Sequence, residues 1–355
     1  MTTSSDRPKR TPKSLNATTL SSKYIESRAS IMSKAASALK FRRKFTFATK
    51  DVTHWFPGHM MKGMKQMQSK LQDVDLIVEI HDARIPFSGR NPKFRDTLLV
   101  RPHLFILNKM DLADLSNKDQ IEEQLRKEGV ENVMYTNSKD GHNKTIMKEI
   151  VPAFKKLIES EDRYNRAQEV DFNLMILGVP NVGKSSFINA IRQTQLKKGG
   201  KATSVGAVPG ITRSVLERIR VCNRPKIYVF DTPGIMNPNI KDVEVGMKLA
   251  LCANLKDHLV GPDVIVDYML YWLNKHKQFD YVDHFKLSAP TDDVTLFLAH
   301  VAKEQGYIEK RKAVVGGYMY RWNFDAASAI ALRAFREGKL GKVMLDTNYI
   351  HSKVT

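Results

Sequence analysis

Residues 178–185, GVPNVGKS, constrain what this chain can fold into more than any other stretch of its sequence. They match the pattern GxxxxGK[ST] and lie between an apolar run, residues 172–178, and a helical segment that begins KSSFINAIRQ. In such a strand–loop–helix unit, glycine lets the backbone approach phosphate oxygens, and N–H groups at the helix start attract the anion. A glycine turn with an exposed lysine is the alternative, but the flanking strand and helix favour a phosphate-binding loop.

The residues of this loop are expected to bind a nucleoside triphosphate. Lys184 should bridge the β- and γ-phosphate oxygens, which makes it the first predicted catalytic residue. The Ser185 hydroxyl should ligate Mg²⁺. The nucleotide contacts predicted from this loop are Asn181, Val182, Gly183, Lys184, Ser185 and Ser186.

A second motif, NKMD at residues 108–111, indicates which nucleotide is bound. Asp111 can accept hydrogen bonds from N1–H and the exocyclic amine of guanine, a pair of donors that adenine lacks. Asn108 can bond N7 of the base, and the stem of Lys109 can pack along its ring. NKxD alone is a weak signal, but it is a strong one directly after the apolar run HLFIL in a chain with a phosphate-binding loop. The motif therefore favours GTP over ATP.

A further predicted strand, residues 132–138, ends in TNSKDG and can complete the base pocket. Ser138 and Lys139 can supply a backbone contact to guanine O6, although by itself this segment is only a polar turn. The predicted guanine contacts are Asn108, Lys109, Met110, Asp111, Asn137, Ser138 and Lys139.

The segment DTPG, residues 231–234, supplies the expected contacts to the γ-phosphate side of the nucleotide. Asp231 should hold Mg²⁺ through a water molecule, and the Gly234 N–H should meet the γ-phosphate. Upstream, the loop VGAVPGITRS offers Thr212 as a second Mg²⁺ hydroxyl and predicted catalytic residue, because it lies between the two motifs. Ile235 follows DTPG where a Ras-like enzyme carries a glutamine that orients the attacking water. We therefore expect slow intrinsic hydrolysis.

The order of these motifs is reversed, because an ordinary GTPase has its phosphate loop first and its base-reading motif last. Residues 158–171 are the candidate connector that rejoins the sheet, so the loops still meet at the carboxyl ends of parallel strands. Alternating strands and helices predict an α/β fold. We expect a circularly permuted P-loop GTPase domain, with a mostly parallel sheet and one antiparallel edge, followed by a small all-α domain.

Charge and composition divide the chain into three predicted parts. These are a disordered basic targeting segment, residues 1–50; the GTPase domain, residues 51–250; and a helical domain, residues 251–355. The net charge is +19, and twelve Lys and Arg against two acids give the first part +10, which leaves +9 elsewhere. A basic, serine-rich, acid-poor N-terminus favours an organelle transit peptide. The alternative is a disordered basic arm that touches RNA or merely keeps the chain soluble.

Two further features exclude other classes of protein. No apolar run approaches the roughly 18 residues that a membrane-spanning helix needs. Cys222 and Cys252 have no CxxC spacing and no clustered histidines, so we interpret them as reduced structural thiols.

In combination, the motifs resemble those of the circularly permuted GTPases of ribosome assembly. The resemblance covers residues 53–350 and includes HWFPGHM, DARIPFSGRNP, NKMD, GVPNVGKSS, VPGITR, DTPGI and FREGKLGKVMLD. TNSKDG departs from the commoner Ser-Ala-Lys, which puts the O6 contact in question, and residues 1–50 lie outside the likeness.

This resemblance implies a GTP-hydrolysing switch for late assembly of the large ribosomal subunit, here in the mitochondrial matrix, that binds ribosomal RNA. It implies that His59 positions the catalytic water, whereas the sequence alone indicates only a histidine after a Pro-Gly turn. Asn181 lies where potassium-stimulated GTPases place an asparagine that helps to hold K⁺, and the alternative is an asparagine that caps the loop. We expect a monomer, with peripheral contact to the inner membrane left open.

The resemblance implies that the helical domain is the RNA- or ribosome-binding domain, and RNA contact is expected where its cations and aromatic residues mix. The predicted patch comprises residues 310–312 and 320–322 with Arg333, Arg336, Lys339 and Lys342. Three alternatives stay open: a nucleotide-independent RNA-binding scaffold, a small-molecule kinase or ATPase, and the same GTPase acting in the nucleolus or cytosol.

Overall fold

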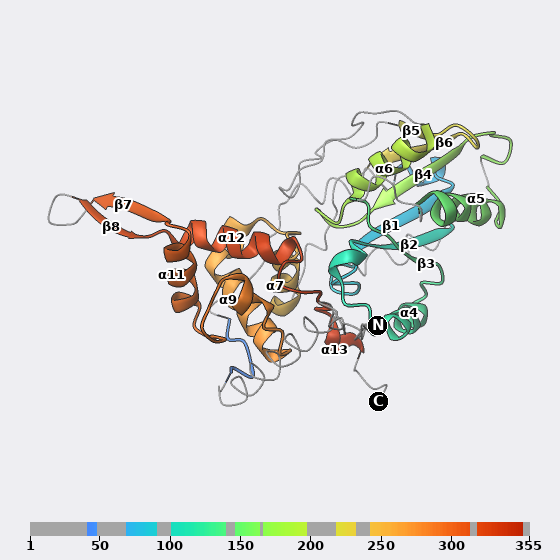
Figure 1. The fold of residues 1–355 in the computed structure, drawn as a ribbon. Helices are drawn as coiled ribbons and strands as arrows, with labels where there is room; N and C mark the ends of the chain where they lie inside the picture. The colour runs from blue at the N-terminus through green and yellow to red at the C-terminus, as the bar shows by residue number, and fades with distance from the viewer. Residues whose placement is uncertain are drawn as a thin grey trace, which may run out of the picture.

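A computed structural model of the 355-residue chain shows a six-stranded sheet in one half of the molecule and a helical region in the other (Figure 1). The structure describes residues 41–47, 69–90, 101–139, 146–163, 166–196, 218–231, 242–312 and 318–350.

The sheet has the permuted order that the motifs predict. Its strands are β1 (Leu76–Asp82), β2 (His103–Asn108), β3 (Val133–Tyr135), β4 (Phe172–Leu177), β5 (Arg218–Cys222) and β6 (Ile227–Asp231). They lie side by side as β3-β2-β1-β4-β6-β5, and every pair is parallel except β5 with β6. The chain runs outward from β1 to β3 and crosses back to β4. It then continues to the edge strand β5 and returns in β6, which lies between β4 and β5. The junction of β1 and β4 is therefore the topological switch point, where ligands bind beyond the strand ends.

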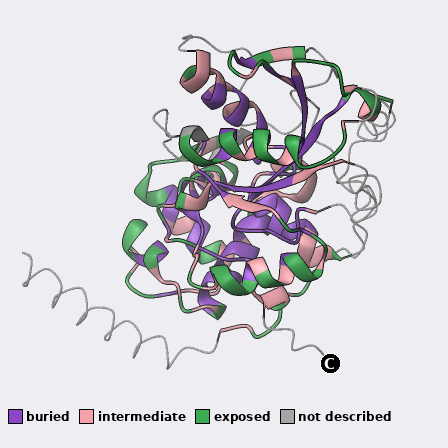
Figure 2. Cartoon of the chain, turned by 90° about the vertical axis from the view of Figure 1, so that its right-hand side faces the viewer, coloured by how far each residue is buried: buried purple, intermediate pink, exposed green. Residues whose placement is uncertain are grey.

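Alternation along the strands decides which helices cover each face. Leu76, Val78 and Ile80 of β1 lie in one apolar cluster with α5 (Val151–Glu159) and α6 (Lys184–Leu196). On β2, Phe105 and Leu107 point to the opposite face and pack with α4 (Lys118–Lys127). Figure 2 shows the buried residues on the strands and on the inward sides of the helices. The sheet is thus covered on both faces, as a parallel sheet requires.

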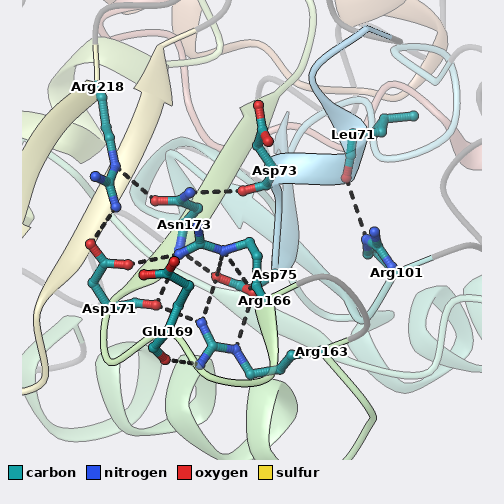
Figure 3. A network of polar contacts seen from close by, with 10 residues as sticks. All are labelled: Leu71, Asp73, Asp75, Arg101, Arg163, Arg166, Glu169, Asp171, Asn173 and Arg218. Carbon is teal, nitrogen blue, oxygen red and sulfur yellow. Dashed lines mark hydrogen bonds and ion pairs between the residues drawn. The ribbon is translucent and has the colours of Figure 1, made fainter.

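The connector that follows α5 is held at the amino ends of the strands by a network of ion pairs (Figure 3). Arg163 and Arg166 both bond the buried carboxylate of Asp75, which directly precedes β1, at 3.1 Å. Asp171 accepts from Arg166 at 2.7 Å and from Arg218 of β5. Charge pairing therefore joins the predicted connector to the strands on both sides of β4, at the end of the sheet away from the phosphate loop.

The helical region contains seven helices among the described residues. They are α7 (Val243–Leu251), α8 (Asp257–Val260), α9 (Pro262–Lys275), α10 (Asp280–His284), α11 (Val294–Glu304), α12 (Phe324–Arg336) and α13 (Thr347–Ile350). Carboxylate or amide side chains cap three of them: Asp242, Asp293 and Asn323 accept backbone N–H groups at the starts of α7, α11 and α12. The fold class is confirmed. The region also holds a hairpin, β7 (Ile308–Lys312) with β8 (Tyr318–Trp322), that we did not predict.

The end of the chain returns from the helical region to the sheet. Val343 forms a parallel bridge with Ala113, beyond the guanine motif, and the Leu345 N–H donates to the Arg84 carbonyl at 2.9 Å. The apolar cluster on the α5–α6 face also continues into α7, α9 and α12. The division at residue 250 stays a prediction, since the described core runs across it.

The assignment of residues 1–50 to a disordered segment needs a correction. Residues 41–47 lie against the helical region: Arg42 bonds Asp267 at 2.7 and 3.1 Å and Asp292 at 3.0 Å. Phe45 makes ring contacts with Tyr268 and Tyr271. The composition of this stretch suggested an import signal because its cations have no acidic neighbours in sequence, whereas the partners of Arg42 lie more than 200 residues away. Among the described residues, no helix is long and apolar enough to cross a bilayer.

Replacing Arg42 tests whether this segment belongs to the folded body. We expect Arg42→Ala to lower the free energy of unfolding by about 1–2 kcal/mol, since a half-exposed guanidinium that bonds two carboxylates is partly screened by solvent. Thermal or urea unfolding measures the loss. Arg43→Ala, which removes the same charge from an exposed neighbour, is the control. Equal stability of the two variants would contradict the docking.

Candidate functional site

The phosphate loop, residues 178–185, joins β4 to α6 at the switch point of the sheet. Gly178 and Gly183 have φ values of +143° and +101°, which residues with a side chain rarely adopt. A Cβ on Gly178 would lie 2.2 Å from the Ile80 carbonyl oxygen, so β1 and the loop approach too closely for any other residue. Lys184 is buried, and its Nζ donates to the carbonyl groups of Gly178 and Val179 at 3.1 and 3.0 Å. The loop is thus folded around its own lysine.

Asn108 connects the phosphate loop to the guanine-reading loops. Its Nδ2 donates to the Val182 carbonyl at 2.7 Å, and its Oδ1 accepts from the backbone N–H and the hydroxyl of Ser138, both at 3.0 Å. The structure thereby brings together three sequence motifs that lie up to 74 residues apart. A buried amide with these partners holds both loops in register at the carboxyl ends of β2, β3 and β4.

Lys109 of the NKMD motif is oriented by a residue that the sequence analysis did not assign. It has a left-handed backbone with φ 58°, and its Nζ bonds the Asp82 carboxylate at 2.9 Å. Asp82 ends β1 directly opposite Asn108 in the parallel register, and it is fully buried. Arg84 bonds the same carboxylate at 2.7 and 2.9 Å. The sequence did contain a signal that could have identified Asp82, because it is an acidic residue at the end of the predicted strand that precedes the guanine motif.

The charge of Asp82 is stabilised by its partners. Burial alone would raise the pKa of the Asp82 carboxyl, but the positive charges of Arg84 and Lys109 outweigh burial and hold that pKa well below its usual range. The ionised carboxylate therefore contributes stability above the unfolded pKa, and this contribution is lost only as the pH falls through the lower folded value. Near neutral pH, Lys109 has a charged and fixed partner.

The phosphate loop also contacts the helical region. Asn181, with φ 59°, donates from Nδ2 to the Ala253 carbonyl at 2.9 Å, just beyond the end of α7. The buried Asn254 donates in return to the Pro180 carbonyl. The loop that would hold the triphosphate is thus bonded to the helix that follows the DTPG segment.

Several predicted site residues cannot be placed. His59, Thr212 and Gly234 lie outside the described residues, as does the side chain of Asp231, whose backbone pairs with Ile176 of β4. The part of the chain that the structure describes holds no group of three or more His, Cys, Asp or Glu that could bind a metal ion. Of the predicted Mg²⁺ ligands, Ser185 alone has a described side chain, in the first turn of α6.

The remaining predicted contacts lie at the same end of the sheet. Met110 and Asp111 form the short 3-10 turn η4 (Met110–Leu112) after β2, and Asn137 accepts the Lys139 N–H in the turn after β3. Val182 is a buried residue of the phosphate loop, and Ser186 follows the loop in α6. Both cysteines are buried and free, and burial raises the pKa of the Cys252 thiol to about 12, so it stays protonated.

The sheet order and the two joined nucleotide motifs define a circularly permuted P-loop GTPase. The chain is 52% identical over 310 residues to mitochondrial ribosome-associated GTPase 1 of Ictalurus punctatus, which covers 86% of this chain and 96% of that relative. It belongs to the mitochondrial ribosome-associated GTPase 1 family, whose members in Xenopus tropicalis and Bos taurus are 50% and 46% identical to it.

More distant similarities extend along the same chain. Ribosome biogenesis GTPase A of Bacillus cereus is 32% identical over 302 residues, covering 83% of this chain and 94% of that protein. A family model described as a 50S ribosome-binding GTPase matches residues 173–310. The solved structure of GNP-bound YlqF from T. maritima covers 80% of this chain and 97% of that one, with 21% identity and a TM-score of 0.49.

Gly183→Ala tests the contact between the phosphate loop and the guanine motif. The added Cβ would lie 2.3 Å from Asn108 Nδ2, so we expect GDP and GTP to bind at least about tenfold more weakly, a loss of about 1.4 kcal/mol. Titration with a fluorescent guanine nucleotide measures the affinity. Gly306→Ala is the control, because Gly306 also has a positive φ but open space around it. Unchanged nucleotide affinity in Gly183→Ala would contradict the close approach.

Asp82→Asn tests the orientation of Lys109. Removing the charge leaves Arg84 buried without its ionic partner, so we expect the melting temperature to fall and, separately, GTP affinity to fall about tenfold. Asp75→Asn is the matched control, because it removes a buried carboxylate paired with two arginines at the opposite end of the sheet. Both variants are measured well below their melting temperatures. Equal GTP affinities in the two would show that Asp82 acts on stability alone.

Proposed function

We propose that this chain is a GTP-hydrolysing switch that promotes late assembly of the large mitochondrial ribosomal subunit, slow alone and stimulated by the ribosome. The observation that carries the proposal is the Asn108 junction, which joins a phosphate loop to a guanine motif in a chain 52% identical to a mitochondrial ribosome-associated GTPase. An RNA-binding scaffold that binds no nucleotide would not need a phosphate loop joined to a guanine motif.

The residues of the loop fit a Mg²⁺-bound triphosphate. Gly178 and Gly183 give the loop backbone its positive φ values, and α6 begins at Lys184, where the N–H groups of a helix start attract an anion. Ser185 and Thr212 would supply hydroxyl ligands, and Asp231 would act through water. When bound, the Mg²⁺ would neutralise charge that develops on the phosphate oxygens. Lys184 would leave the loop carbonyls for the β- and γ-phosphates, and the Gly234 N–H would bond the γ-phosphate.

The switch depends on the ribosome for positioning the water that attacks the γ-phosphate. Ile235 cannot hydrogen-bond water, so the water must be held by a group outside the DTPG segment. We assign this part to His59, in the segment HWFPGHM, when the ribosome is bound. Slow intrinsic turnover and ribosome stimulation then have one common cause.

A potassium ion would complete the charge balance at the β–γ bridge. The Asn181 amide oxygen is a ligand of the kind that K⁺ accepts, and the Nδ2 of the same amide is held by the Ala253 carbonyl. The ion would stand in for the arginine that other GTPases place against the transition state. The contact of Asn181 with Ala253 ties this position to the helical region.

Binding to ribosomal RNA would fall on the helical region and use the positive charge of the chain. Arg336 is removed from the predicted patch, because its guanidinium bonds Asp257 at 2.6 and 2.8 Å and the carbonyls of Ala250 and Leu251. Arg333, Lys339 and Lys342 are retained. We place the protein in the mitochondrial matrix as a monomer, with peripheral contact to the inner membrane as a secondary association.

GTP turnover with and without purified large mitochondrial ribosomal subunits tests the proposal. We expect stimulation of at least about tenfold, abolished in Lys184→Ala and strongly reduced in His59→Ala, which should keep its slow intrinsic rate. Replacing K⁺ by Na⁺ should lower turnover in the unmodified chain.

Each comparison in this experiment tests a different part of the proposal. Equal turnover with and without subunits would remove the ribosome-stimulated switch, and retained stimulation in His59→Ala would remove that assignment alone. Equal rates in K⁺ and Na⁺ would remove only the potassium site. Small ribosomal subunits serve as the control for unspecific RNA effects.

A further inference from the structure

The β7–β8 hairpin projects from the helical region, at the end of the molecule away from the sheet (Figure 1). Its base is fixed at both strands: the Tyr307 N–H donates to the Ala302 carbonyl of α11 at 2.8 Å, and the Asn323 N–H donates to Tyr307 at 3.0 Å. Asn323 then caps α12 by accepting the Ala326 N–H. A two-stranded hairpin alone is marginally stable, so this anchoring is what holds it out from the surface.

One face of the hairpin carries a row of aromatic side chains. Tyr318, Tyr320 and Trp322 alternate along β8, so they lie on the same face, and their exposed fractions are 60%, 69% and 39%. Successive members are about 6.7 Å apart along the strand, twice the spacing of about 3.4 Å between stacked nucleotides. Ile308, opposite Trp322, is also exposed. Three large exposed rings in one row form a surface that folding does not require.

Positive charge accompanies this row. Lys310 pairs with Tyr320 in the register and lies on the same face, with its Nζ 3.9 Å from the centre of the Tyr318 ring. The ion pair between Glu309 and Arg321 belongs to the other face, so the single acid of the hairpin does not adjoin the aromatic row. By sequence, β7 and β8 contain four cations, Lys310, Arg311, Lys312 and Arg321, against Glu309, a net charge of +3.

We propose that this aromatic face of the hairpin binds a single-stranded segment of RNA, with bases stacked on Tyr318, Tyr320 and Trp322 and a phosphate met by Lys310. Aromatic rings in a flat row on a strand, interleaved with cations, are the arrangement by which sheets bind unpaired nucleotides. The inference rests on the proposed function only for the source of that RNA, the large ribosomal subunit.

The geometry favours unpaired RNA over two other partners. Duplex RNA hides its bases inside the helix, so it would meet the cations but leave the rings without partners. A bilayer would accept exposed tyrosine and tryptophan at its interface, but the described face has Ile308 as its one aliphatic member and a net charge that suits a polyanion. Both rivals predict measurable outcomes.

Fluorescence anisotropy of full-length protein with a labelled single-stranded RNA of about 12 nucleotides tests the assignment. We expect tighter binding to this RNA than to its duplex, and a loss of at least about 30-fold in the triple variant Tyr318→Ala, Tyr320→Ala, Trp322→Ala. Tyr318→Phe with Tyr320→Phe should retain affinity within about twofold, because the rings still stack. Leu296→Ala, which removes an exposed apolar side chain from α11, should change nothing.

The contribution of Lys310 is measured separately, by the salt dependence of RNA affinity. Lys310→Gln should lower the slope of log affinity against log salt by about 0.7, the value for one contact to a single strand. Ultraviolet cross-linking of the unmodified chain gives a measurement that no variant can confound. It should place RNA adducts on Tyr318, Tyr320 or Trp322.

Four results would overturn the inference: equal RNA affinity in the triple and unmodified chains, preference for duplex, adducts confined to other segments, or hairpin-dependent binding to anionic phosphatidylcholine–phosphatidylglycerol vesicles in place of RNA. Turnover with large subunits, measured on the same proteins, separates this inference from the proposed function. Stimulation of the unmodified chain without hairpin-dependent RNA binding refutes the hairpin assignment alone. Hairpin-dependent RNA binding without stimulation refutes the switch alone.

Discussion

The buried carboxylate of Asp346 is the interaction on which the joining of the two halves depends. It accepts the backbone N–H groups of Phe87 and Ser88 at 2.8 Å, the Ser88 hydroxyl and the Lys248 ammonium at 3.3 Å. Lys248 is itself buried and also bonds Asn348 at 2.8 Å. Because a buried charge is costly without partners, these contacts favour the arrangement in which the end of the chain, the loop after β1 and helix α7 meet at Asp346.

This arrangement reaches the guanine pocket through a short series of contacts. Leu345, next to Asp346, bonds the backbone of Arg84, whose side chain holds Asp82, and Asp82 in turn holds Lys109. On the other side, α7 ends where Asn181 and Asn254 bond the phosphate loop to the helical region. The guanine-reading loops and the phosphate loop are thus both connected by hydrogen bonds to the helical region, which carries the hairpin. Permutation makes this possible, because the segment after DTPG leads into α7 instead of into another strand.

Sequence reasoning succeeded where a short local pattern carries the chemistry. The phosphate loop, the NKMD motif and the apolar strands predicted the sheet and its permuted order, because strand alternation and helix starts are properties of neighbouring residues. It missed the hairpin, since exposed aromatic residues in short strands resemble a helix or loop when burial is unknown. It misjudged Arg336 and Arg42, whose cations look solvated in sequence but meet carboxylates of distant segments.

The sequence by itself determined the class of nucleotide site, the base it reads and the order in which the strands are laid down, because each depends on residues within a few positions of one another. Only the tertiary structure decided which charges are structural and which are available. Asp82, Asp346, Arg42 and Arg336 all acquire their partners through folding. The physical reason is that the role of an ionised side chain is set by what surrounds it when it is removed from water, and those surroundings come from segments that are remote in the chain.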